Sequence, residues 1–400
     1  MSKQKKMLMW LVILTGMFQM PSIAISAAVH TMSEVIFQVD LVKVQSSLSV
    51  TGIVSPIVSF ISAFLIRKDI ATKRGVVIFG LGALGVTGII SAFMFQHTFF
   101  WSIAALSVAI GIATGCYVST AISLVIDGFS VDERRKINGL HSVFVGIGGI
   151  LISTVGGLLV NYVWYAGYLI LMIGIPMCIF SVIAIPKTEK KKTNENGEAK
   201  VKSKLDPDVF FYIAIIFVFM FLYNSGSSNM STHLENSGIE NYAMIAGFVT
   251  AAQMGGTMVM SMFFNKLSQK LGDMLLVLAF AAIFVGFTIV NVFHSSVVMI
   301  FIGIFLMGTS MPCLGPQCLL SISKRVDDST SALASSMANG VAPGLGSFLS
   351  PIIITNFTVW IAGNNTNFRY QFVAFLALGC AIILFALNKV REKKLAGKYN

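Results

Sequence analysis

Twelve long stretches of this 400-residue chain contain no Asp, Glu, Lys or Arg, and this feature decides its class of fold. A helix rises about 1.5 Å per residue, so about 20 apolar residues cross the hydrocarbon core of a bilayer. A helix also satisfies its own backbone hydrogen bonds where no water is present. The sequence therefore predicts an all-α integral membrane protein with twelve transmembrane helices, at approximately residues 7–29, 45–66, 75–96, 99–126, 140–163, 164–186, 209–228, 241–264, 274–293, 297–320, 332–357 and 370–387.

Basic residues lie almost entirely on one side of this predicted bundle. The termini and every second connection carry all of the 28 Lys and Arg residues except Lys43 and Arg369. Lys and Arg accumulate on the cytoplasmic side of membrane proteins. Both termini of this multi-pass protein are therefore predicted to be cytoplasmic, at the cell membrane. The net charge of +11 is interpreted as contact with anionic lipid, not with nucleic acid.

One long hydrophilic connection divides the predicted helices into two sets of six. Residues 187–208 are rich in Lys, Asn and Glu and contain no aromatic residue, so they are predicted to form a cytoplasmic linker. Residues 1–186 are the predicted N-terminal half, and residues 209–400 are the C-terminal half with a short basic cytoplasmic tail. Val131-Asp132-Glu133 before the fifth span is similar to Val326-Asp327-Asp328 before the eleventh. Duplicated six-helix halves are typical of secondary transporters.

Two segments of the chain resemble motifs of the major facilitator superfamily. Asp69-Ile-Ala-Thr-Lys73-Arg74, between the second and third spans, is similar to the charged Asp-Arg-x-Gly-Arg-Arg loop of that superfamily. The segment from Ile126 to Arg135, which contains Asp127, resembles the end of the fourth helix in members of that superfamily. The resemblance covers essentially the whole chain and implies a secondary transporter of the 12-helix bacterial type. It also implies a cytoplasmic gating network that latches the two halves in one access state, formed by Asp69, Lys73, Arg74, Asp127, Glu133 and Arg134.

Polar residues in the first span recur at helical spacing. They follow one another at steps of three or four residues, and they are Thr15, Gln19, Ser22, Ser26 and His30, followed by Glu34. Because a helix repeats every 3.6 residues, they are predicted to form one stripe. The stripe either lines a water-filled path or packs on neighbouring helices through hydrogen bonds. His30 and Glu34 are one turn apart, and histidine titrates near neutral pH, so this pair is the candidate for proton coupling.

The resemblance also implies that the first, fourth, seventh and tenth spans line a central cavity. The candidates for substrate binding on these spans and on the eighth are Gln19, Ser22, Ser26, Tyr117, Thr120, Tyr223, Asn224, Gln253, Cys313 and Gln317. The polar segment 223–229 is predicted either to unwind partly or to be the end of the seventh helix. Pro312 and Pro316 predict a kink in the tenth span.

The predicted spans offer no charged side chain to a charged substrate. A buried anion would need Arg or Lys, and a buried cation would need Asp or Glu. A neutral or amphipathic organic solute is therefore expected, and the 32 Phe and 21 Met residues supply adaptable apolar surface. The favoured function is proton-linked efflux by alternating access. The alternatives are uptake of a neutral nutrient, by symport or facilitated diffusion, and a transporter-like receptor that binds a ligand without transport.

Other chemistry finds no support in the sequence. The cysteines lie inside predicted spans without metal-ligand spacing and are interpreted as packing residues: Cys116, Cys178, Cys313, Cys318 and Cys380. No metal site, cofactor or catalytic nucleophile is predicted, so the chain is not expected to be an enzyme. The expected partners are a small-molecule substrate, protons or another coupling ion, and membrane lipids. The protein is expected to be a monomer.

Overall fold

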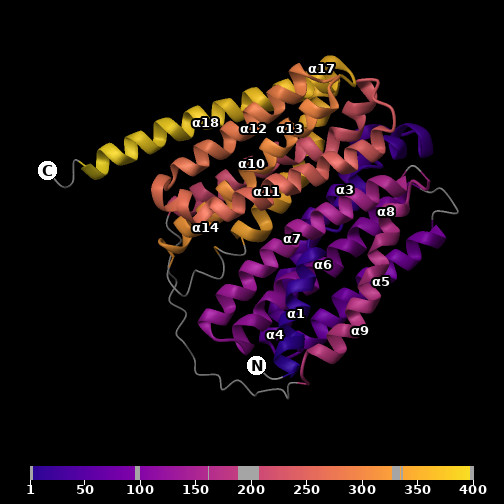
Figure 1. Ribbon diagram of the computed structural model, residues 1–400, viewed down its shortest axis with the longest axis vertical. Coiled ribbons are helices and arrows are strands. Elements are labelled where there is room, and N and C mark those ends of the chain that lie inside the picture. The colour runs from indigo at the N-terminus through magenta and orange to yellow at the C-terminus, as the bar shows by residue number, and fades with distance from the viewer. Residues whose placement is uncertain are drawn as a thin grey trace.

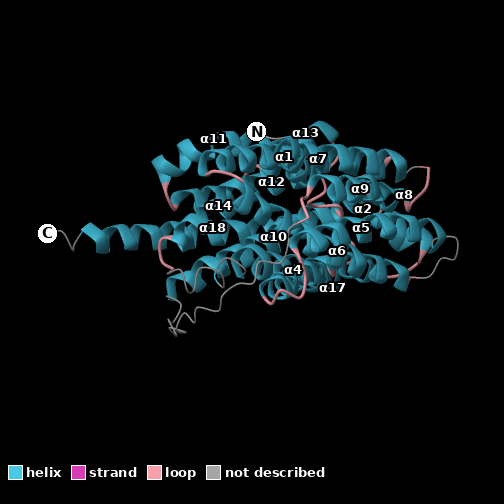
Figure 2. Ribbon diagram, turned by 90° about the horizontal axis from the view of Figure 1, so that it is seen from below, coloured by secondary structure: helices cyan, strands magenta, loops and turns pink. Residues whose placement is uncertain are grey.

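The computed structural model describes residues 3–94, 100–160, 162–187, 207–326, 334 and 337–396, and within them the regular structure is helical throughout (Figure 2). The elements of the N-terminal half are α1 (Lys3–Met17), α2 (Ile23–Ser26), η1 (Thr31–Ile36), α3 (Leu41–Ser49), α4 (Thr51–Arg67), α5 (Lys73–Met94), α6 (Trp101–Gly128), α7 (Val131–Val160), α8 (Ala166–Leu169), η2 (Ile170–Ile173) and α9 (Gly174–Ala184). Those of the C-terminal half are α10 (Pro207–Asn236), α11 (Tyr242–Leu271), α12 (Met274–Val292), α13 (Val297–Gly308), α14 (Ser310–Ser323), η3 (Met337–Val341), α16 (Ala342–Ser350), η4 (Pro351–Thr355), α17 (Asn356–Ala362) and α18 (Thr366–Ala396).

The two halves lie side by side, with the N-terminal half in indigo to magenta and the C-terminal half in orange to yellow (Figure 1). Helix α7 packs along α11, and α4 packs along α16, so both contacts join one half to the other. Lys5 at the start of α1 contacts Glu133 at the start of α7. We call this end of the bundle, where α1 and α7 begin and α4 and α11 end, the basic end, and we call the opposite end the far end.

The predicted second to twelfth spans are confirmed. Among the described residues, 11 helical segments are long and apolar enough to cross a membrane, and each coincides with one of these spans. Their ends differ from the predicted ends by a few residues, most of all where α10 and α11 continue into the polar residues beyond the membrane core. The chain is thus a multi-pass helical membrane protein.

The first span is not one continuous helix, and this part of the prediction was wrong. Helix α1 ends at Met17, and after a break the chain forms the short helix α2 and the π-helical turn η1. Pro21 lies inside the break, where its ring and missing N–H are incompatible with a helix interior. The polar residues Thr15 to Glu34 therefore do not form one uninterrupted stripe.

Two further predictions concern polar and proline-containing helices. The segment 223–229 neither unwinds nor ends the helix, because α10 continues to Asn236, and this prediction was wrong. Within it the Asn229 side chain donates a hydrogen bond to Ser225 O, one turn earlier, at 2.9 Å. The tenth span is interrupted for one residue at Thr309, between α13 and α14 and shortly before Pro312 and Pro316, and the kink itself stays a prediction.

Glycine pairs allow the helices of the two halves to approach closely. A Cβ atom added to Gly247 of α11 would lie 2.6 Å from the Cα atom of Gly157 on α7. On the other interface, a Cβ atom added to Gly344 of α16 would collide with the carbonyl oxygen of Gly52 on α4. Small residues of this kind let backbones pack against each other in a membrane, where no hydrophobic force drives helices together.

Candidate functional site

A cavity of about 410 Å³ lies between the two halves. Its walls come from the break after α1, from α3 and α4, and from α7 in the N-terminal half, and from α10, α11, η3 and α16 in the C-terminal half. The helices that the family resemblance implied contribute unequally, because α6 supplies only Thr114 and α14 only Met311 among the lining residues. A cavity of this volume is within the range of small-molecule binding sites.

The walls of the cavity are polar but uncharged. Seventeen of the lining residues carry a hydroxyl or a carboxamide, and they are Gln19, Ser22, Ser26, Ser49, Thr51, Ser55, Thr114, Tyr223, Asn224, Ser227, Ser228, Thr250, Gln253, Thr257, Ser261, Asn339 and Ser347. Within the described part of the chain, no Asp, Glu, Lys, Arg or His lines the cavity, and Tyr223 is its one aromatic residue. The walls therefore offer hydrogen bonds without a fixed charge.

Six of the sequence-predicted substrate residues line this cavity: Gln19, Ser22, Ser26, Tyr223, Asn224 and Gln253. The break in the first span does not remove its polar residues from the wall, because the broken segment itself turns toward the cavity. Two of the six, Tyr223 and Gln253, lie within hydrogen-bonding reach of each other at the wall, and the Tyr223 hydroxyl also approaches Thr257. These two residues extend from neighbouring helices, α10 and α11.

The other four predicted substrate residues are buried outside the cavity lining. The Tyr117 hydroxyl donates a hydrogen bond to the carbonyl oxygen of Phe18, where α1 has ended and that oxygen has no helical partner. Thr120 and Cys313 are buried by neighbouring helices. Gln317 lies toward the basic end, where its Nε2 atom donates to Asp273 at 3.0 Å. These side chains stabilise the helix bundle in this conformation.

A buried polar cluster joins the two halves at the far end, beside the cavity. Gln45 of α3 is 1% exposed, and its Nε2 atom donates to Ser228 O at 2.6 Å and to Asn229 Oδ1 at 2.9 Å. Its Oε1 atom accepts a hydrogen bond from Thr355 Oγ1 at 3.0 Å. One side chain of the N-terminal half thus bonds to two elements of the C-terminal half. Ser228 also lines the cavity, so this cluster lies directly beside it.

His30 also joins the two halves at the far end, but not with the predicted partner. Its Nε2 atom lies 3.8 Å from Glu235 Oε2 of α10, and its backbone N–H donates to Ser231 Oγ at 3.3 Å. The His30 ring packs edge-on against Tyr242 of α11. Glu34 is exposed, and no hydrogen bond or ion pair joins it to His30 in the part of the chain that the structure describes.

Comparison with known proteins agrees with this architecture. The family model described as Major Facilitator Superfamily matches residues 7–351, which is most of the chain. The chain belongs to the Major Facilitator Superfamily. The resemblance inferred from its sequence motifs is confirmed. A search of curated proteins found no match.

Solved structures of Major Facilitator Superfamily transporters share the fold at low sequence identity. The nucleoside transporter NupG is 14% identical, with 96% of this chain and 98% of that chain covered and a TM-score of 0.69. The D-xylose-proton symporter is 13% identical, covers 94% and 96%, and has a TM-score of 0.72. The peptide transporter POT in complex with sulfate is 14% identical, covers 97% and 94%, and has a TM-score of 0.74.

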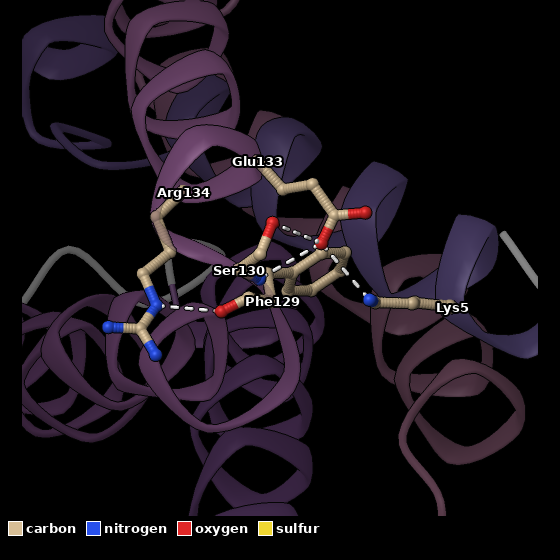
Figure 3. A network of polar contacts seen from close by, with 5 residues as sticks. All are labelled: Lys5, Phe129, Ser130, Glu133 and Arg134. Atoms are coloured by element: carbon tan, nitrogen blue, oxygen red, sulfur yellow. Dashed lines mark hydrogen bonds and ion pairs between the residues drawn. The ribbon is translucent and has the colours of Figure 1, made fainter.

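Part of the gating network expected for this superfamily forms contacts at the basic end (Figure 3). Glu133 Oε2 accepts hydrogen bonds from the Ser130 backbone N–H at 2.9 Å and from Lys5 Nζ at 3.0 Å. These two partners hold the pKa of Glu133 below its usual value, the Ser130 N–H having the larger effect. Arg134 Nε donates to Phe129 O at 2.8 Å, which satisfies a carbonyl just before α7 begins. Each of these contacts is made within the N-terminal half.

The remaining predicted members of the network are dispersed. Arg74 donates a hydrogen bond from Nη2 to Val182 O near the end of α9, at 2.8 Å. Asp69 is exposed in the loop after α4, with a positive φ of 55°. Lys73 begins α5, and the side chain of Asp127 lies outside the residues that the structure describes. The role of these residues as a latch that holds the halves together in one access state stays a prediction.

Sequence reasoning missed the most highly bonded carboxylate of the basic end. Asp273 accepts hydrogen bonds from Tyr212 at 2.6 Å, Ser321 at 2.9 Å and Gln317 at 3.0 Å. Burial raises the pKa of Asp273, but these bonds and the charge of Arg325 outweigh burial and hold it below its usual value. The signal in the sequence was an acidic residue directly after Gly272, in the short connection between the eighth and ninth spans.

Proposed function

We propose that this protein is a secondary transporter that moves an uncharged, polar organic solute across the cell membrane by alternating access. The observation that carries the proposal is the cavity between the two halves, whose walls are rich in hydroxyl and carboxamide groups. Membership of the Major Facilitator Superfamily supports transport as the general function. The chemistry of the cavity supports the choice of solute class.

The absence of charge from the described cavity walls argues for a neutral solute. Moving an ion into a membrane-embedded site without a counter-charge is costly, so transporters of ions place charged or backbone groups there. Hydroxyl and amide side chains instead replace the water that a neutral polar solute loses on entry. Gln253 and Tyr223 are suited to this exchange, because they present a carboxamide and a hydroxyl beside each other at the cavity wall.

The orientation of the protein follows from its charge distribution. Lys and Arg residues gather at the basic end, and such residues favour the cytoplasmic side of a membrane. We therefore assign the basic end, with both termini and the linker 187–208, to the cytoplasm. Polar contacts of His30 and Gln45 join the halves at the far end, which supports our assignment of this conformation to a state closed toward the outside.

Proton linkage is part of the proposal and is assigned to the His30–Glu235 contact, with Glu34 nearby in sequence. None of the described cavity-lining residues titrates near neutral pH, so a coupling group must lie elsewhere. His30 is buried and contacts a carboxylate of the opposite half, so its protonation state changes the attraction between the halves. One solved structure of the same fold is a D-xylose-proton symporter.

Efflux of amphipathic compounds is the second candidate function. It is favoured by five methionines in the cavity wall: Met20, Met220, Met254, Met258 and Met311. Flexible, polarizable Met side chains adapt to varied apolar shapes. The expected phenylalanine contribution is missing from the described lining residues, which places this candidate second.

The test is solute flux in proteoliposomes, with labelled uncharged polar solutes compared against labelled cationic amphipaths. We expect saturable flux of at least one uncharged solute, with loss of flux in Ser227→Trp, which fills the cavity. Ser295→Trp, on an exposed turn, is the matched control and should retain flux. Flux of amphipaths alone would favour the second candidate, and no flux of either class would contradict transport of both.

A further inference from the structure

Arg369 is a completely buried cation at the far end of the bundle. It lies one turn inside α18 and is 0% exposed, although its sequence position suggested an outer connection. Its Nη1 atom donates to Asn229 Oδ1 at 2.6 Å, and its Nε atom donates to Thr358 Oγ1 at 2.9 Å. The remaining nitrogen, Nη2, has no hydrogen-bond partner among the described residues.

The buried charge of Arg369 faces no counter-charge in the part of the chain that the structure describes. Within the described part of the chain, no Asp or Glu lies within ion-pairing distance of its guanidinium, and both of its acceptors are neutral. Removing a guanidinium from water without an anionic partner is strongly unfavourable, and neutral hydrogen bonds compensate only in part. The closed far end therefore contains a group whose free energy would fall if water reached it.

The same cluster contains the contact that holds the far end closed. Asn229 Oδ1 accepts hydrogen bonds from Arg369 and also from Gln45, which belongs to the other half. Separating the halves at this end removes Gln45 from Asn229, Ser228 and Thr355, and it opens the side of Asn229 that Gln45 covers. Opening thus breaks the bonds of Gln45 and brings water to the Arg369 cluster.

We propose that Arg369 is a positioning residue that favours opening of the far end, and that Gln45 opposes it by holding the two halves together. This proposal rests on the proposed function, because alternating access requires both states to be populated. A transporter works only if neither state is too stable, and a ligand shifts a two-state equilibrium only by its differential affinity. The buried cation limits the stability of the closed state, so that the open state is also populated.

Two substitutions in the same cluster should have opposite effects. Arg369→Met removes the charge while Asn229 Oδ1 keeps its bond from Gln45 and Thr358 keeps its bond to Ile354 O. The closed state should become more stable. Gln45→Leu keeps the side-chain volume but removes three hydrogen bonds between the halves, so the population of the open state should rise. Arg369→Lys keeps the charge and should remain close to the parent protein.

The experiment measures the distance between spin labels on the far end by double electron–electron resonance, without any solute. The labels are attached to Asp40→Cys and Asn364→Cys, at exposed positions of opposite halves, in a protein whose five native cysteines are replaced. We expect the ratio of short to long distances to rise about tenfold in Arg369→Met and to fall about tenfold in Gln45→Leu. Arg369→Gln is the second variant if Arg369→Met does not fold.

A shift of Arg369→Met and Arg369→Gln toward long distances would overturn the proposal, because Arg369 would then be a clamp. Unchanged distances in both variants would overturn it as well. The result is independent of solute identity, so it separates this inference from the proposed function. Absence of solute flux in the parent protein together with the expected distance shifts would contradict only the proposed transport function, whereas normal flux without the shifts would contradict only the role of Arg369.

Discussion

At the scale of single residues, similar polar side chains lie in different surroundings, some bonded within the helix bundle and others at the cavity wall. Gln317 and Gln253 illustrate the difference. Gln317 accepts from Ser268 and donates to Asp273, so its carboxamide is committed to the protein. Gln253 lines the cavity beside the Tyr223 hydroxyl and makes no bond to a charged group among the described residues. The same side chain thus has a structural role in one helix and a proposed binding role in another.

Gln253→Leu should weaken solute binding with little effect on stability. A lost hydrogen bond to a bound neutral solute is worth about 0.5 to 1.5 kcal/mol, which corresponds to a rise in KM of roughly 2- to 13-fold. The measurement is the concentration dependence of flux in proteoliposomes. Gln317→Leu is the control, and it should lower the melting temperature and leave KM unchanged. An unchanged KM in Gln253→Leu would show that this side chain does not contact the solute.

Asp273→Asn should lower the free energy of unfolding at neutral pH by about 1 to 3 kcal/mol. The reason is that hydrogen bonds to a charged group are lost at a site that solvent screens only modestly. The pKa of Asp273 is lower in the folded protein than in the unfolded chain. Its contribution is therefore complete above the usual carboxyl pKa and is lost as the pH falls through the folded value.

The check on this prediction is thermal unfolding in detergent as a function of pH. The difference between the parent protein and Asp273→Asn should be largest at neutral pH and should disappear in acid. Asp40→Asn is the matched control, since Asp40 forms an exposed pair with Lys43 and its removal should have almost no effect. A constant difference between pH 7 and strongly acidic pH would contradict the assigned role of the charge.

At the scale of helices, the sequence predicts where the membrane spans lie, but it does not predict which side chains contact each other between helices. Apolar run length reports the thickness of the bilayer directly, and it located the second to twelfth spans. The break at Pro21 was overlooked because the apolar run continues through it. The partners of Gln45 and Gln317 lie 184 and 44 residues away, distances that no helical period can reveal. The candidate site was accordingly predicted in part, through the residues around Gln19, Asn224 and Gln253.

Gly344→Ala should disturb the contact between α4 and α16. The added methyl group would collide with Gly52 O, so the two helices must move apart. Overpacking of this kind costs about 1 to 3 kcal/mol, and here it acts on the contact between the halves. We expect a lower melting temperature together with a reduced transport rate.

The control for this substitution is Gly315→Ala in α14, where the added methyl group meets no atom within 4 Å. Both variants replace a helical glycine by a better helix former, so any difference between them reports packing. Equal melting temperatures and equal transport rates in the two variants would show that the close approach of α4 and α16 is unimportant.

At the scale of the whole molecule, the two halves meet along glycine-lined helices and are joined at the far end by polar contacts. The cavity lies between the halves, and its described walls carry no charge. This arrangement is consistent with the proposed transport, in which the two halves move around a neutral solute. The titratable contact at the far end, His30 with Glu235, is where proton binding would alter the attraction between the halves.

Glu235→Gln should reduce solute-driven proton movement, because the neutral amide no longer attracts protonated His30. The measurement uses proteoliposomes with a pH-sensitive dye inside and the transported solute added outside. We expect about a tenfold loss in Glu235→Gln and nearly full movement in Glu34→Gln, since Glu34 is exposed and makes no contact with His30 among the described residues. Loss of proton movement in Glu34→Gln with nearly full movement in Glu235→Gln would indicate that Glu34 is the coupling residue.

The most direct test of the central claim is solute flux with the two halves locked together and released. Thr31 and Tyr242 are hydrogen-bonded across the halves at 3.3 Å, so Thr31→Cys and Tyr242→Cys place two thiols for a short, reducible cross-linker. In a protein whose five native cysteines are replaced, alternating access predicts that flux of the uncharged solute stops on cross-linking and returns on reduction, while either single-cysteine variant is unaffected. Undiminished flux through the cross-linked protein would contradict the account.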